Sequence, residues 1–179
     1  MRRTAGARLL WSPLPGREKE AARSLFASGE ELEFAKSQPE RAILEYRLLL
    51  SSPDATARAG ALLRIARCQR TLRRPADALE TYHRLTAMGA ARAAGAPAEL
   101  VGLRERAALL EAAGHAAAAS RERARLKAVL EQGLHQLDRA TFEFYAQGIP
   151  IGADAHAWAE GVEQLWKRGA EATRGSEVF

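Results

Sequence analysis

A ten-residue stretch of this chain recurs further along it, and the recurrence limits the possible folds more than any other feature. Residues 37–46 match residues 73–82, so that Pro39 aligns with Pro75 and Tyr46 with Tyr82, 36 positions later in each case (75 minus 39, 82 minus 46). The same offset aligns three further apolar pairs: Ala42 with Ala78, Ile43 with Leu79, and Leu49 with Leu85. Self-similarity at a period of about 20–50 residues is typical of stacked units that are each too small to bury their own apolar face.

The composition predicts that these units are helical. Apolar residues make up 47% of the 179-residue chain, with alanine the commonest of them, and aromatic residues make up only 6%. Ala, Leu, Glu and Arg all favour helices, and no segment alternates in the way that a half-buried strand does. We therefore expect an all-α protein.

Prolines, glycines and capping residues set the expected helix boundaries. Pro39 and Pro75 each follow a tight turn and stand in the first turn of a helix, where proline is tolerated. Gly114 and Gly133 each end a helix. Residues 90–97 form a connector rich in glycine and alanine. The expected helices cover residues 18–36, 39–50, 55–72, 75–88, 98–113, 115–132, 138–147 and 155–167. In the first of them, the predicted inward stripe consists of Ala21, Ala22, Leu25, Leu32 and Ala35, with Phe26 and Phe34 at its flanks.

The same boundary residues divide the chain into four parts. Residues 1–16 are basic and interrupted by glycine and proline, and we expect a flexible lead there. Residues 17–147 form the predicted helical-repeat domain. Residues 148–167 form a loop followed by a capping helix that carries Trp158 and Trp166 on one stripe. Residues 168–179 form a polar, frayed tail.

The two matched units resemble the tetratricopeptide repeat, a helix–turn–helix unit of about 34 residues. The signature small residue of its first helix is Ala66 in the second unit and Glu30 in the first. A third and weaker unit covers residues 98–132. Positions of the signature are also occupied by Leu62, Ile65, Ala78, Tyr82 and Leu85 in the second unit, and by Phe26, Ala42, Tyr46 and Leu49 in the first. The resemblance implies about two clear repeats, one degenerate repeat, and a protein-interaction module whose concave face is lined by the first helix of each unit.

Repeat spacing predicts which residues line that face and bind a partner. Arg67 and Arg70 share one side of a helix, and guanidinium groups pair well with carboxylates. We therefore hypothesise that the groove binds an acidic or carboxylate-ended peptide. The alternative is that both arginines pair with Glu31 or other acids of this chain. Arg64 and Arg104 are placed at the edge of the groove. The predicted groove residues are Ala27, Glu31, Phe34, Leu63, Arg67, Arg70 and Thr71.

Two other functions remain open. Residues 40–85, 95–111 and 139–145 resemble the amino-terminal sensor segment of some bacterial sensor histidine kinases, which implies a sensing or docking part of a larger signalling protein. The chain itself shows no phospho-acceptor helix and no Gly-rich ATP lid. The net charge of +5 allows a nucleic-acid-binding protein. The arginines alternate with acidic residues at helical spacing, which favours salt-bridged surfaces instead.

Catalytic and metal-binding patterns are not evident. The single cysteine, Cys68, allows no intrachain disulfide and is expected to be a buried structural thiol. The histidines at 83, 115, 135 and 156 are too far apart to predict a metal site. The run Glu30, Glu31 and Glu33 is interpreted as a solvated helix face. No Gly-rich phosphate loop and no membrane-spanning run of about 18–20 apolar residues occurs. We expect no enzyme, no cofactor and a cytoplasmic protein, or an extracytoplasmic one if the chain belongs to a sensor.

Overall fold

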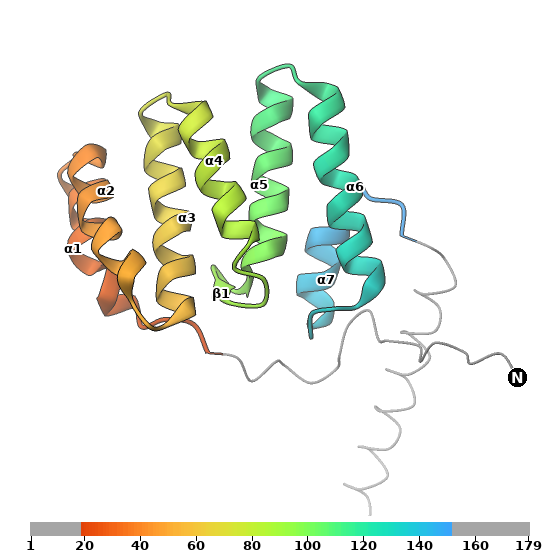
Figure 1. The fold of residues 1–179 in the computed structure, drawn as a ribbon, viewed down its shortest axis with the longest axis horizontal. Helices are drawn as coiled ribbons and strands as arrows, with labels where there is room; N and C mark the ends of the chain where they lie inside the picture. The colour runs from red at the N-terminus through yellow and green to blue at the C-terminus, as the bar shows by residue number, and fades with distance from the viewer. Residues whose placement is uncertain (1–18, 152–179) are drawn as a thin grey trace, which may run out of the picture. The chain divides into compact units, whose positions relative to one another are not determined.

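A computed structural model describes residues 19–151 and confirms the expected all-α class, with one small hairpin added (Figure 1). Residues 19–126 belong to one compact unit and residues 127–151 to a second. Within the described residues, each helix is too short or too polar to cross a membrane. The elements in chain order are η1 (Arg23–Phe26), α1 (Ala27–Glu30), η2 (Glu31–Ala35), α2 (Pro39–Leu48), η3 (Leu49–Ser51), α3 (Ala55–Thr71), α4 (Pro75–Thr86), β1 (Arg92–Ala93), β2 (Ala96–Pro97), α5 (Ala98–Ala112), α6 (Ala116–Gln132) and α7 (Arg139–Ala146).

The two matched stretches of sequence adopt the same local structure. Each begins with a residue in the left-handed region, Ser37 at φ 52° and Arg73 at φ 56°. Each continues with a proline in the first turn of a helix, which opens α2 and α4. Each then buries an alanine and a tyrosine at the same two positions of that helix: Ala42 and Tyr46 in α2, Ala78 and Tyr82 in α4.

Helices that follow one another in the chain pack side by side. Within residues 19–126, α1 packs on α2, α2 on α3, α3 on α4 and α4 on α5 (Figure 1). A glycine lies at three of the closest approaches between elements. A Cβ atom built on Gly29 would come 2.3 Å from the Tyr46 ring, and one on Gly60 would come 2.6 Å from the Phe26 ring. A Cβ on Gly102 in α5 would lie 2.9 Å from backbone atoms of α4. These glycines let large side chains and backbones meet at contact distance.

The first predicted helix forms only in part, and its inward stripe was misplaced. The helical turns run from Arg23 to Ala35 and change from 3₁₀ (η1) through α (α1) to π (η2). Phe26 is buried, whereas Leu25, expected inward, is 46% exposed. Gly29, and not Glu30, is the small residue beneath the Tyr46 ring. The 3₁₀ and π turns each depart from 3.6 residues per turn, so a uniform helical period assigns the wrong face. Ala22 and Ala35 are exposed as well, while Ala21 and Leu32 pack against the core.

The predicted connector at residues 90–97 contains a two-stranded hairpin. Strands β1 and β2 pair antiparallel, with Arg92 opposite Pro97 and Ala93 opposite Ala96. The two turn residues, Ala94 at φ 52° and Gly95 at φ 81°, are both left-handed. A two-residue turn with two positive φ angles matches the right-handed twist of a hairpin.

The later helices agree closely with their predicted bounds. Asp54 caps α3 by accepting a hydrogen bond from the Thr56 backbone N–H at 2.8 Å, and Asp138 caps α7 in the same way through Thr141. The left-handed Gly114 lies two residues after the end of α5, and the left-handed Gly133 directly follows the end of α6. The predicted lead (1–16), the capping helix (155–167) with its two tryptophans, and the tail (168–179) lie outside the described residues.

Candidate partner-binding surface

An exposed aromatic side chain marks the first site of interest. Phe34 lies on the π-helical η2, and 64% of its surface is exposed to solvent. The guanidinium carbon of Arg67, on α3, lies 4.8 Å from the centre of the Phe34 ring. A cation over an aromatic face is attracted by the ring quadrupole. Arg67 on the neighbouring helix therefore contacts the exposed Phe34 ring.

Arg67 is itself fixed by a buried carboxylate. Its Nε and Nη2 atoms donate to the two carboxylate oxygens of Glu33 at 2.6 and 2.7 Å, and the Glu33 side chain is only 6% exposed. The Tyr46 hydroxyl donates to the same carboxylate at 2.9 Å. Two parallel N–H bonds to a carboxylate set both the distance and the orientation of a guanidinium group. The expected solvated face of acidic residues is thus wrong for Glu33.

The ionisation of this cluster follows from its burial. Burial raises the pKa of the Glu33 carboxyl, but hydrogen bonds from Arg67 and Tyr46 together with the Arg67 charge outweigh it, and the pKa lies below its ordinary value. Burial, reinforced by Glu33, raises the pKa of the Tyr46 phenol, which stays protonated as a donor. Burial and the Glu33 charge also raise the pKa of Cys68 to about 12. The prediction of a buried thiol is confirmed, and this thiol is a poor nucleophile near neutral pH.

A second pair of charges links α3 to α1, the helical turn before η2. Arg64 of α3 donates to one oxygen of Glu30 in α1, at 2.9 Å from Nε and 2.6 Å from Nη2. Its guanidinium carbon lies 3.7 Å from the centre of the buried Phe26 ring. The Gly60 carbonyl accepts a further bond from Arg64 at 3.2 Å. This arginine is held on three sides by the chain.

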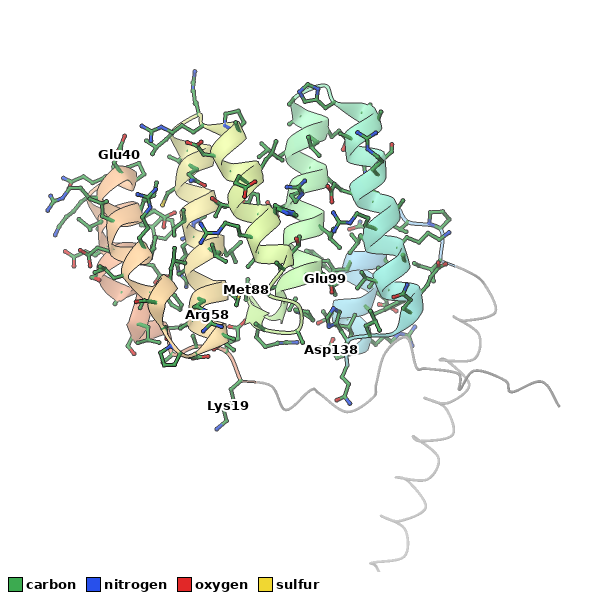
Figure 2. All side chains as sticks on the ribbon, viewed as in Figure 1. Lys19, Glu40, Arg58, Met88, Glu99 and Asp138 are labelled. Carbon is green, nitrogen blue, oxygen red and sulfur yellow. The ribbon has the colours of Figure 1, made fainter. Side chains whose placement is uncertain are left out.

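These side chains line a pocket of about 330 Å³ between η1, α1, α3 and the hairpin. Phe26, Gly60 and Leu63 supply apolar surface, and Arg64 and Arg67 form part of the wall. A shallower hollow of about 410 Å³ lies along the start of α3 and the segment that follows α4, where Figure 2 labels Met88. Lys19 lines that second hollow at its edge, and its side chain points away from the helices in Figure 2. Thr56 and Arg92 line both hollows.

Arg70 lies on the same helix but has a different environment. It donates to Glu105 of α5 at 2.7 Å, and both side chains are partly exposed, 46% for Arg70 and 28% for Glu105. The Tyr82 hydroxyl lies 3.5 Å from the same Glu105 oxygen. Arg67 and Arg70 therefore both pair with acids of this chain, namely Glu33 and Glu105, and Glu31 pairs with Lys36 at 2.7 Å instead.

The structure brings only some of the predicted groove residues together. Leu63 and Arg67 line the pocket, Phe34 contacts Arg67, and the Thr71 hydroxyl donates to the Arg67 carbonyl at 3.2 Å. Ala27 and Glu31 are exposed but do not line the pocket.

Several pocket residues were missed from the sequence, among them Arg23, Phe26, Glu30, Gly60 and Arg92. One signal was available for part of this set. Glu30 and Arg64, and likewise Glu33 and Arg67, are opposite charges exactly 34 positions apart. Opposite charges separated by the expected repeat length indicate a contact between neighbouring helices, whereas the 36-residue offset of the matched stretches points to other positions.

No metal site is evident in the described part of the chain, where no group of three or more His, Cys, Asp or Glu side chains is placed to hold an ion. Comparison of the chain with protein-family models, with curated proteins and with solved structures finds no significant match.

Proposed function

We propose that this chain is a helical-repeat protein of the tetratricopeptide type, and that it binds a peptide or a partner protein on one face. We call this surface the first-helix face. It consists of Phe34, Leu63, Arg67 and the pocket of about 330 Å³ beside them.

The spacing of contacts between neighbouring first helices supports the repeat. Glu30 with Arg64 and Glu33 with Arg67 are each separated by 34 residues, and Arg70 with Glu105 by 35. A tetratricopeptide unit is about 34 residues long. The matched turns and helices of residues 37–46 and 73–82 add a second, independent line of support.

The observation that carries the binding function is the exposed and fixed Phe34 beside a pocket. Aromatic residues, phenylalanine among them, and arginine are enriched at protein interfaces. Arg67 joins the two features, because it contacts the Phe34 ring and also lines the pocket. The buried Glu33 holds Arg67 in place, so a partner meets a surface whose side chains are already ordered, and little conformational entropy is lost on binding. Phe34 and Glu33 lie on a π-helical turn, a feature frequent at functional sites.

A random peptide library displayed on phage tests the proposal. The library is selected against the immobilised full chain, and the enriched peptides are measured by fluorescence anisotropy. We expect peptides with a shared sequence pattern, and we expect Phe34→Ser and Leu63→Ser each to weaken their binding by about tenfold or more, as at a binding hot spot.

Leu48→Ser is the matched control, because Leu48 is a similarly exposed apolar residue (70%) on α2 and does not line the pocket. It should leave binding unchanged. Enriched peptides that bind Phe34→Ser as well as they bind the original chain would contradict the proposal, as would a selection that enriches no pattern.

A further inference from the structure

The pocket beside Phe34 contains two arginines that make no ion pair with a carboxylate of the described residues 19–151. Arg64 and Arg67 also line it, but each is neutralised by a glutamate, Glu30 or Glu33. Arg23 of η1 has no ion pair with any described residue. Arg92 of β1 has none either, and within the described residues its Nη2 donates a hydrogen bond to the Gly95 carbonyl.

The net charge of the pocket is therefore positive. Glu20 is the remaining acid in the wall, and its carboxylate accepts a hydrogen bond from the Gly95 backbone N–H. Arg23 and Arg92 against Glu20 leave one uncompensated positive charge. A single carboxylate would balance it.

The buried Nε–H of Arg92 also lacks an acceptor. It is one of the few side-chain donors in the described residues that are inaccessible to solvent and make no hydrogen bond. Water does not reach this N–H, so a carboxylate in the pocket would meet the other N–H groups of the Arg92 guanidinium.

The hairpin that presents Arg92 is held in a strained conformation. Ala94 lines the pocket and lies at φ 52°, a left-handed conformation that costs alanine energy. Arg92 and Glu20 each bond to the neighbouring Gly95 and hold the turn in place. Strain that the surrounding contacts maintain is found most often at functional positions.

We propose that this pocket takes up the carboxylate of an acidic side chain, aspartate or glutamate, from the bound peptide, with Arg23 and Arg92 as its donors. The inference rests on the proposed function and assigns the charge recognition to different arginines from Arg67 and Arg70. Guanidinium groups suit the task, because each offers several N–H donors in the plane of a carboxylate. The methylene groups of the acidic side chain would contact Leu63 and Ala93, which supply apolar wall in the same pocket.

A small probe tests the pocket without any peptide. The full ¹⁵N-labelled chain is titrated with N-acetyl-glutamate methylamide, a capped glutamate, and in parallel with the corresponding capped glutamine. We expect the capped glutamate to shift the amide signals of residues 23 and 92–95 with a saturable Kd of about 1–10 mM, the range of a single weak contact. The capped glutamine should not. Arg23→Gln and Arg92→Gln should each raise the Kd at least about fivefold, since each removes a charge-assisted bond. Arg47→Gln, at an exposed arginine of α2, is the control and should not change it.

The results that would contradict the carboxylate pocket differ from those that would contradict the proposed function. Equal shifts with the two capped amino acids, or no saturable shift with either, would overturn the carboxylate pocket. Enriched peptides that depend on Phe34 but keep their affinity when their acidic residues are neutralised would overturn it too, and would leave the proposed function standing. Saturable capped-glutamate binding that Arg92→Gln weakens would support the pocket, even if the library enriched no peptide.

Discussion

Two clusters in this protein use the same three residue types and differ in depth. In the first, Tyr46 and Arg67 both donate to Glu33, at 2.9 Å and at 2.6–2.7 Å, and Glu33 is 6% exposed. In the second, Tyr82 and Arg70 approach Glu105 at 3.5 and 2.7 Å, and Glu105 is 28% exposed. The charges are also exchanged. The acid of the first cluster belongs to the earlier helix of the pair, and the acid of the second belongs to the later one.

The difference shows what decides whether an arginine is available to a ligand. Arg67 and Arg70 are three residues apart on α3, and from the sequence they look equivalent. The depth of the partner carboxylate separates them. Glu33 cannot be left without its donors, because a buried unpaired carboxylate is costly. Glu105 can be solvated when its donor moves away, since partly exposed ion pairs contribute little. Arg67 is therefore a fixed part of the first-helix face, whereas Arg70, outside that face, is free to move away from Glu105.

Removing the two carboxylates gives the largest expected contrast. Glu33→Ala should lower the free energy of unfolding by about 2–4 kcal/mol, because Tyr46 and Arg67 lose a buried acceptor. Glu105→Ala should lower it by about 0.5 kcal/mol, the usual value of an exposed pair. Urea unfolding followed by circular dichroism measures both. Equal losses of unfolding free energy in the two variants would contradict the proposed difference between the clusters.

Removing the two hydroxyl groups gives a smaller contrast of the same sign. Tyr46→Phe deletes a 2.9 Å bond to a buried carboxylate, and we expect a loss of about 1–2 kcal/mol. Tyr82→Phe deletes a contact of 3.5 Å, at the limit of a hydrogen bond, and should cost less than about 0.5 kcal/mol. Both rings stay buried, so packing is preserved and serves as the internal control. A larger loss for Tyr82→Phe would reverse the ranking.

The pH dependence of stability sharpens the comparison further. The pKa of Glu33 in the folded protein lies below its ordinary value of 4.5. Its contribution to stability is therefore complete above that value, and it is lost as the pH falls through the lowered folded pKa, because the unfolded chain takes up the proton first. Urea unfolding between about pH 6 and pH 3 should show a shallower decline for Glu33→Gln than for the original chain. The decline for Tyr46→Phe should be intermediate between those of Glu33→Gln and the original chain, because the Tyr46 hydrogen bond accounts for part of the lowering of the Glu33 pKa. Parallel declines for all three proteins would contradict the assignment.

Features that depend on local sequence were predicted well. Pro39 and Pro75 open α2 and α4 because a proline in the first helical turn loses no hydrogen bond. The buried Ala78 and Tyr82 follow from the matched stretches, and the helices expected from residues 55 and 138 begin at Asp54 and Asp138, short acidic side chains of the kind that cap helices.

Features that depend on tertiary contacts were not predictable. Glu33 stands in a run of acids that looks solvated, and its burial requires Arg67, 34 residues away. In η1 to η2, the Tyr46 ring packs over Gly29. The hydrophobic period of a single helix gives no information about such a contact with another helix. The hairpin was missed because its turn, Ala94-Gly95, lacks the Asn-Gly or Asp-Gly pair that marks such turns. Arg92 reaches the pocket only through that hairpin, so it was missed with it.

Hydrogen–deuterium exchange of the full chain, with and without the tightest peptide from the library, tests the central claim most directly. It maps the bound surface without any substitution. If the first-helix face is the binding surface, the peptide should slow exchange in residues 23–35, 56–67 and 92–95 and leave α2 unchanged. Slowed exchange confined to residues 40–51, on α2 and η3, would contradict the account.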